Sequence, residues 1–136
     1  MKTAIRYYSK TGHTKKMAER IEKVIGTKAL SIDNPINEDV DVLFLGSAVY
    51  AAGIDGNVKN FIASLNKEKV KNVICFSSAA VLTSSYPQVK TLLEKQGLNV
   101  DEREFHCRGQ FSLIHRGRPN DEDLKNLELF IKGLNL

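Results

Sequence analysis

The most informative stretch of this chain reads Ser9-Lys10-Thr11-Gly12-His13-Thr14. It follows an apolar candidate strand at residues 3–8 and precedes apolar residues at helical spacing between positions 17 and 25. A junction between a strand and a helix leaves backbone N–H groups unpaired at the positive end of the helix dipole, where phosphate binds readily. Hydroxyls add neutral donors, and glycine permits close approach. We therefore expect a phosphate-binding loop, with an ordinary turn capped by Ser and Thr as the alternative.

Two nucleotide-binding signatures are missing from the sequence, and their absence narrows the choice of ligand. The chain contains no G-x-x-x-x-G-K-[ST] segment, which excludes the loop that binds nucleoside triphosphates. No G-x-G-x-x-G segment follows the first candidate strand, so the dinucleotide fingerprint is missing as well. A phosphate loop rich in hydroxyls instead suits a mononucleotide with a terminal phosphate.

Length and composition indicate one domain over residues 1–136. The sequence is 42% hydrophobic and 26% charged, which is normal for a globular protein with a single core. No apolar run approaches a membrane span, and the first residues do not form a signal sequence, so we expect a cytoplasmic protein with no membrane partner. Two cysteines without a C-x-x-C motif and three histidines give no support for a metal site or a disulfide framework.

The charge balance is moderately basic. Lys and Arg outnumber Asp and Glu by 20 to 16, for a formal net charge of +4. The basic clusters are mixed with acids and contain no interleaved aromatic residues, so we expect a solvated surface and no nucleic-acid partner. Lys15 and Lys16 would lie in the first turn of the first helix and oppose its dipole. A bound dianionic phosphate would relieve that conflict.

Strand and helix patterns alternate along the whole chain. The last expected strand alternates apolar with charged residues, which is typical of a half-exposed edge strand. Helical spacing follows every expected strand except the second, after which at most one helical turn fits, at residues 36–40. The five expected strands lie at residues 3–8, 29–32, 41–46, 72–77 and 100–107.

The helix boundaries carry recognisable signals. Ser84 or Ser85 would begin the third helix, and Gly97 would end it. Asn120 would cap the fourth. The alternation predicts an α/β sandwich with a parallel sheet, whose ligands bind outside the carboxyl ends of the strands. Arg6 fits poorly in a buried central strand, so we expect a structural ion pair or a position near the strand end, and no catalytic role.

Three loops would converge at that edge of the sheet. The first is the phosphate loop, the second spans residues 47–56, and the third spans residues 78–84. The second and third loops contain small residues and a single aromatic residue, Tyr50. Small residues allow a planar ring to lie against the backbone, and an aromatic side chain can stack on it. The three loops together could therefore hold a phosphate and a planar ring.

On these residues the chain resembles the flavodoxin family in its short-chain form, over nearly its whole length. The resemblance rests on Tyr-Tyr-Ser-Lys-Thr-Gly-His-Thr at residues 7–14 and Gly-Ser-Ala-Val-Tyr-Ala-Ala-Gly at residues 46–53. Phe-His-Cys-Arg-Gly-Gln-Phe at residues 105–111 is similar to a short flavodoxin-like tail. The resemblance implies a flavodoxin-like three-layer sandwich, a five-stranded parallel sheet of order 2-1-3-4-5, and non-covalently bound FMN.

The family's cofactor contacts can be carried over to this sequence residue by residue. The phosphate would be held by Ser9, Lys10 through its backbone, Thr11, Gly12, His13 and Thr14. The isoalloxazine ring would be bordered by Ser47, Ala48, Val49, Tyr50, Ala51 and Gly53, and its pyrimidine side by Ser78, Ala79 and Ala80. His13 stands where the family commonly has asparagine. The flavin would supply the chemistry, so no side chain is expected to act as a catalytic nucleophile or base.

Three functions are compatible with this interpretation. The first is an FMN electron carrier that exchanges electrons with redox partner proteins. The second is an FMN-dependent NAD(P)H oxidoreductase acting on quinones or similar small-molecule acceptors, and the third is a flavin-free binding or regulatory module. A phosphoacceptor receiver shares the gross fold but needs carboxylates at the ends of the first and third strands. There the chain has Tyr8-Ser9 and Gly46-Ser47, which excludes a receiver.

Two features depart from familiar electron-carrier flavodoxins, which are strongly acidic and often place a tryptophan beside the flavin. This chain is basic and contains no tryptophan. Positive charge stabilises an anionic reduced flavin. We therefore hypothesise that Lys10, Lys15 and Lys16 raise the potential of the flavin.

Overall fold

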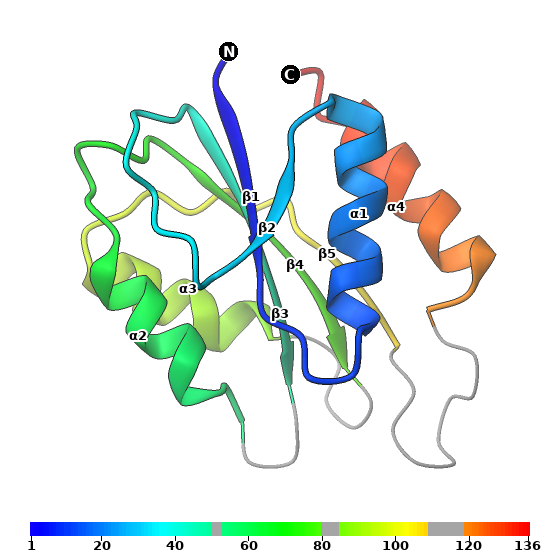
Figure 1. Ribbon diagram of the computed structural model, residues 1–136, viewed down its shortest axis with the longest axis horizontal. Helices are drawn as coiled ribbons and strands as arrows, with labels where there is room; N and C mark the ends of the chain where they lie inside the picture. The colour runs from blue at the N-terminus through cyan, green and yellow to red at the C-terminus, as the bar shows by residue number, and fades with distance from the viewer. Residues whose placement is uncertain (50–52, 80–84, 109–118) are drawn as a thin grey trace.

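The computed structural model describes residues 1–49, 53–79, 85–108 and 119–136. Its strands form one parallel sheet of order β2-β1-β3-β4-β5, so both the predicted fold class and the predicted strand order are confirmed (Figure 1). The strands are β1 (Thr3–Tyr7), β2 (Ala29–Ser31), β3 (Val42–Val49), β4 (Val73–Ala79) and β5 (Phe105–Arg108). The helices are α1 (His13–Ile25), α2 (Gly56–Ser64), α3 (Tyr86–Lys95) and α4 (Asp121–Gly133).

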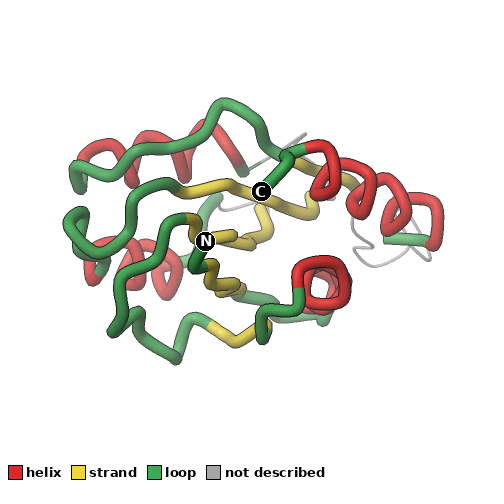
Figure 2. Tube along the Cα trace, turned by 90° about the horizontal axis from the view of Figure 1, so that it is seen from above, coloured by secondary structure: helices red, strands yellow, loops and turns green. Residues whose placement is uncertain are grey.

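The helices cover the two faces of the sheet in pairs. Helices α1 and α4 lie on one face and helices α2 and α3 on the other, with the strands between them (Figures 1 and 2). Strand β3 explains the arrangement, because its alternate residues enter two different cores. Phe44 packs in the core with α1 and α4, whereas Leu43 and Leu45 pack in the core with α2 and α3. A strand buried on both faces needs an apolar side chain at every position, and residues 42–45 are all apolar and buried.

The predicted helix boundaries agree with the structure. Helix α4 begins at Asn120, whose side chain accepts from the Asp123 backbone N–H at 2.9 Å while Asp123 accepts from the Asn120 backbone N–H. This reciprocal capping box satisfies two N–H groups that a helix start would otherwise leave unpaired. Helix α3 begins after Ser85 and ends just before Gly97, which has a left-handed φ of +86°. At residues 36–40 the structure has no helical turn.

The predicted last strand is too long. Strand β5 covers only Phe105–Arg108, and Val100 pairs with Val73 as an isolated bridge. The chain turns between these segments because the Asp101 carboxylate accepts from the Arg103 backbone N–H at 2.9 Å and from its guanidinium at 2.8 and 3.0 Å. Alternating hydrophobicity cannot reveal such a local side-chain contact, which competes with strand pairing.

Arg6 has a structural role, although it is not the ion pair offered as one expectation. Its guanidinium donates to the backbone carbonyls of Asn34 at 2.8 Å, Ile5 at 3.1 Å and Pro35 at 3.3 Å. Burial lowers the pKa of this guanidinium. The contacts hold the segment after β2 against the end of β1, next to the edge where the loops converge.

Candidate functional site

Parallel register brings the carboxyl ends of β1, β3 and β4 together. Tyr7 pairs with Gly46, and further along the sheet Ala48 pairs with Ser78. The last pair of β3 and β4 joins Val49 to Ala79. In Figure 1 the beginning of α1 lies at the same lower edge as the ends of β3 and β4. The fold thus places the three predicted loops at one edge of the sheet.

The predicted phosphate loop, residues 9–14, leads into a helix whose start no side chain caps. Gly12 has a left-handed φ of +90°, and no side chain caps the start of α1. Ser9 Oγ instead accepts from the Gly12 backbone N–H at 2.9 Å. The first backbone bond into α1 runs from Lys16 N–H to Gly12 carbonyl at 3.0 Å. The alternative interpretation, in which Ser or Thr caps this helix, is therefore wrong, and the N–H groups of residues 13–15 have no partner among the described residues.

An ion pair connects the first loop to the second. Lys10 Nζ lies 3.2 Å from Asp55 Oδ2. Asp55 also caps α2, because its side chain accepts from the Asn57 backbone N–H at 2.8 Å. Both the Asn57 hydrogen bond and the Lys10 ammonium lower the pKa of this carboxyl, with the hydrogen bond the larger cause. A third contact supports the connection, since Asn57 Nδ2 donates to the hydroxyl of Tyr8 at 3.3 Å.

This pairing changes the charge balance of the loop. Asp55 compensates the charge of Lys10, while Lys15 and Lys16 are exposed on the first turn of α1. The Lys16 ammonium donates to the Pro119 carbonyl at 3.3 Å, just before α4. Neither Asp55 nor Asn57 is among the site residues predicted from the sequence. The signal that could have identified Asp55 is its position as an N-cap residue in front of the apolar pattern of α2.

Three of the predicted cofactor residues meet inside the protein. Thr14 is completely buried, and its hydroxyl lies 3.2 Å from Ser78 Oγ and donates to the Ser47 carbonyl at 3.5 Å. Ser47 and Ser78 are also buried, at 1% and 3% exposure. These side chains therefore do not point into open space at the edge of the sheet. They connect the start of α1 to the ends of β3 and β4.

A second hydroxyl contact lies on the opposite face of the sheet. Ser47 Oγ lies 2.8 Å from Ser85 Oγ, at the start of α3. The Ser85 backbone N–H donates to Ser77 Oγ at 3.5 Å, and both serines are 1% exposed. In the sequence, Ser85 is recognisable only as a helix boundary, and Ser77 is not among the predicted site residues. Their contact with Ser47 depends on strand register and could not be read from local sequence.

Gly46 allows the close packing at this edge. A Cβ at this position would overlap the ring of Phe76 and lie 2.9 Å from Thr14 Cγ2. Phe76 is buried, and it pairs with Gly46 across β3 and β4. Glycine within an apolar strand often marks such a close approach, which is the signal that the sequence offered.

The remaining predicted residues are distributed as follows. Ala48 is buried, and Gly53 has a left-handed φ of +95° with open space where a Cβ would be. His13 is half-buried at the first position of α1, and Thr11 is exposed. Tyr50, Ala51 and Ala80 lie outside the described residues.

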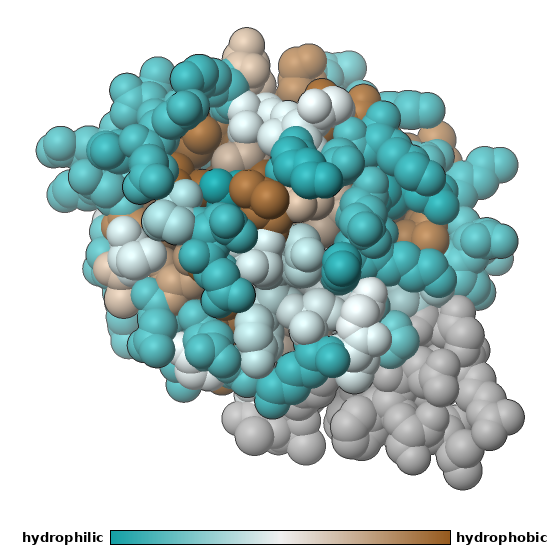
Figure 3. Space-filling model, in the orientation of Figure 1, coloured by the Kyte–Doolittle hydropathy of each residue, from teal (hydrophilic) through white to brown (hydrophobic). Residues whose placement is uncertain are grey.

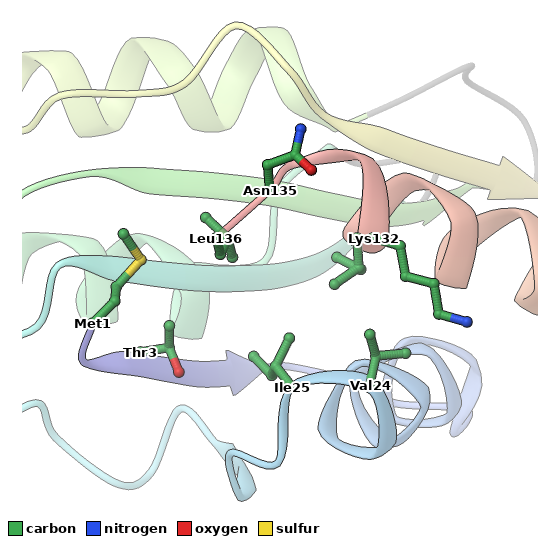
Figure 4. Close-up of a pocket in the computed structure, with 8 residues that line it drawn as sticks. Met1, Thr3, Val24, Ile25, Lys132, Asn135 and Leu136 are labelled. Atoms are coloured by element: carbon green, nitrogen blue, oxygen red, sulfur yellow. The ribbon is translucent and has the colours of Figure 1, made fainter.

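A cavity lies at the other end of the molecule. It has a volume of about 540 Å³. Figure 4 shows it between the start of β1 and the ends of α1 and α4, with Met1, Ile25 and Leu136 among its lining residues. It is therefore separate from the edge where the loops converge. The face shown in Figure 3 is mostly hydrophilic, with only small apolar areas among its described residues.

The described residues show neither a metal-binding cluster nor a membrane-spanning helix. They contain no group of three or more His, Cys, Asp or Glu residues that could hold a metal ion. None of their helices is long and apolar enough to cross a membrane.

The fold defines a doubly wound α/β protein, with a loop at residues 8–12 that joins its first strand to α1. A sequence model described as a flavodoxin domain matches residues 4–113. The chain therefore belongs to the flavodoxin family, whose members bind flavin. Comparison with curated proteins gives no match.

Solved structures share the fold at low sequence identity. An archaeal flavodoxin superposes with a TM-score of 0.78 at 18% identity, over 98% of this chain and 96% of that one. Oxidised Flavodoxin 2 from Bacillus cereus superposes with a TM-score of 0.74 at 15% identity, over 99% of this chain and 98% of that one. A flavoprotein from Lactobacillus acidophilus was solved in complex with FMN. It superposes with a TM-score of 0.59 at 22% identity, over 79% of this chain and 92% of that one.

Proposed function

We propose that this protein binds FMN non-covalently and transfers electrons through it. The observation that carries the proposal is the uncapped start of α1 behind Gly12, at the edge where β1, β3 and β4 end. Open α/β sheets bind ligands at this edge, where the strand order reverses between β1 and β3. Membership of the flavodoxin family supports the phosphate of a flavin mononucleotide as the ligand that we propose for this edge.

The residues present fit a phosphate. Backbone N–H groups of residues 13–15 have no partner among the described residues, and the helix dipole adds partial positive charge. Gly12 leaves open space, because no heavy atom lies within 4 Å of the position that a Cβ would occupy. Lys15 and Lys16 add exposed positive charge in the same turn. Four features thus favour an anion at one point.

The second loop also fits a flat ring. Gly53 presents its backbone in a left-handed conformation with open space beside it, and Ala48 offers only a methyl group at the end of β3. The FMN in the Lactobacillus acidophilus flavoprotein supports the choice of cofactor. When bound, FMN would supply the redox chemistry, while the protein holds and orients it. Tyr50, Ala51, Ala79 and Ala80 remain predicted ring contacts.

Flavin titration tests the proposal directly. Protein freed of small molecules is titrated with FMN, riboflavin and FAD while flavin fluorescence is followed. We expect quenching by FMN at a 1:1 ratio and weaker binding of riboflavin, which lacks the phosphate. The matched variant Gly12→Val should lose this preference, because a β-branched residue is strained at a φ of +90°. Absence of quenching by any flavin would overturn the proposal.

Kinetics then separates a carrier from an enzyme. A carrier needs a separate reductase to deliver its electrons, so the protein alone should oxidise NAD(P)H only slowly in the presence of a quinone. Steady-state turnover of NAD(P)H and a quinone without any reductase would instead support the FMN-dependent oxidoreductase. A reductive titration with two separated one-electron steps would support the carrier.

A further inference from the structure

Hydroxyl groups lie where the core beside α2 and α3 reaches the carboxyl edge of the sheet. Leu45 of β3 packs in this core, and the two-residue period of a strand puts Ser47 on the same face. Strand β4 repeats the pattern, with Ser77 two positions after Cys75. Ser47 and Ser77 are partners in the register of the two strands, and both are 1% exposed. Burial of a hydroxyl costs free energy unless it is hydrogen-bonded, so each of them needs a partner.

The start of α3 supplies that partner. Ser85 Oγ lies 2.8 Å from Ser47 Oγ, and the Ser85 backbone N–H donates to Ser77 Oγ at 3.5 Å. Ser85 is at the N-cap position of α3, where a serine side chain usually accepts a hydrogen bond from the helix. Its side chain makes no such bond to the described N–H groups of α3, and it is 1% exposed. The hydroxyl of Ser85 therefore contacts the sheet instead of capping its own helix.

This contact joins two of the loops that are predicted to border the flavin ring. Ser47 is the first residue of the second loop, residues 47–56, and Ser85 directly follows the third loop, residues 78–84. Buried polar groups that satisfy one another make their surroundings rigid. The beginning of the second loop and the end of the third loop are therefore held at a fixed separation.

We infer that Ser85 is a positioning residue for the flavin ring, acting through the buried hydroxyl of Ser47. It fixes the separation of the two loops before the ring binds, so that less conformational freedom is lost on binding. The inference rests on the proposed FMN function and deepens it. It gives the Ser47 hydroxyl an indirect role at the ring, through Ser85, in place of a direct contact.

A role at the ring predicts equal losses for flavins with and without a phosphate. Ser85→Ala should weaken FMN and riboflavin about fivefold each, the usual effect of one hydrogen bond. The ratio of the two dissociation constants should therefore stay at its wild-type value. A loss for FMN alone, or no loss for either flavin, would overturn the inference.

Helix α3 also provides a matched control. The hydroxyl of Thr91 is exposed on this helix and donates to the Pro87 carbonyl at 2.9 Å, without contact to the sheet. Thr91→Val removes this hydroxyl and keeps the shape of the side chain. It should bind both flavins as tightly as the wild type. An equal loss of affinity in Thr91→Val and Ser85→Ala would overturn the inference, because the contact with Ser47 would then not be the cause.

A double variant separates positioning from stability. Each single variant, Ser47→Ala or Ser85→Ala, leaves the other hydroxyl buried without its partner, which costs more unfolding free energy than the removal of both. The double variant should therefore be more stable than Ser85→Ala in urea denaturation. Its affinity for riboflavin should stay as low as that of Ser85→Ala, because the same contact is missing.

Two results of the double variant would overturn the inference. Affinity that recovers together with stability would show that the contact matters for the folded state alone. A further fivefold loss of affinity relative to Ser85→Ala would show that the Ser47 hydroxyl contacts the ring directly.

Hydrogen exchange of the flavin-free protein provides a readout that does not depend on binding. Ser85→Ala should speed amide exchange at residues 89–92 of α3 and leave the rates at residues 17–20 of α1 unchanged. Equal rates at residues 89–92 in the wild type and Ser85→Ala would overturn the inference even if FMN binds. Faster exchange in a protein that binds no flavin would instead overturn the proposed function, and the role at the ring with it, while the fastening of α3 to the sheet stands.

Discussion

The two halves of β3 and β4 differ in chemistry although they belong to the same two strands. The first halves, residues 42–45 and 73–76, are apolar and almost completely inaccessible to solvent. The second halves, residues 46–49 and 77–79, contain glycine, serine and alanine, and their serines bond to the starts of α1 and α3. The first halves bury surface, while the second halves position loops. Under the proposed function, this difference predicts that stability and ligand recognition are separated along the strands.

The largest effect on the free energy of unfolding is expected from a substitution in the apolar first half of β3. Phe44 is 0% exposed, in the core with α1 and α4. Phe44→Ala should lower the free energy of unfolding by about 3–5 kcal/mol through lost burial and an unfilled cavity. Urea denaturation followed by circular dichroism measures this. The folded fraction should still prefer FMN over riboflavin, and loss of that preference would break the separation between the two halves.

Gly46 lies at the boundary between the halves of β3, so its substitution should affect both the free energy of unfolding and FMN binding. Gly46→Ala forces a methyl group against Phe76 and Thr14. Overpacking of this kind costs about 1–3 kcal/mol of unfolding free energy, and displacement of Thr14 should also weaken FMN. Denaturation and flavin titration of one variant measure both effects. Adding Phe76→Leu should restore part of the stability, and a double variant that recovers none would contradict the steric explanation.

Removing the ion pair between Lys10 and Asp55 should have a smaller effect on the free energy of unfolding and on FMN affinity. Asp55→Ala removes the cap of α2 and should cost about 1 kcal/mol of unfolding free energy. Asp55→Asn is the matched control, because asparagine is an equally good cap that lacks the charge. It should keep the wild-type stability and tighten FMN binding about twofold at low salt, since the charge of Lys10 is no longer compensated. Weaker FMN binding by Asp55→Asn would show that the pairing itself is needed.

The smallest effect is expected from a change of pH, which alters the free energy of unfolding through Asp101, near the start of β4. Asp101 bonds through its backbone N–H to Val73 and accepts from Asn72 and Arg103, and the Arg103 contact is the main cause of a lowered pKa of its carboxyl. A carboxyl whose pKa is lowered by folding stabilises the protein above its unfolded pKa. That contribution is lost as pH falls below about 4 and through the folded pKa.

The measurement is the free energy of unfolding between pH 6 and pH 2. It should fall with pH in the wild type and fall less in Asp101→Asn, while the preference for FMN at pH 7 stays the same in both. An equal fall in both proteins would show that Asp101 does not set the acid stability. A changed preference for FMN would contradict the separation of the two ends.

Several parts of the fold could be recognised in the sequence because their signals are local. The predicted phosphate loop is a run of six residues between a strand and a helix, and Gly12, Gly97 and Asn120 carry conformational preferences of their own. The start of β5 could not be recognised, because the contact of Asp101 with Arg103 overrides an alternating pattern. The capping alternative for α1 was wrong for a similar reason, since Ser9 bonds to Gly12 and leaves the helix itself uncapped.

By itself the sequence determined the order of strands and helices, since hydrophobic period, turn residues and caps act over a few neighbouring positions. Only the tertiary structure decided what each hydroxyl and charge contacts. Thr14 meets Ser78 across 64 positions and Ser47 meets Ser85 across 38, through the register of two parallel strands and the helices packed on them. No local pattern encodes such pairs, because each partner is set by the packing of the whole sheet.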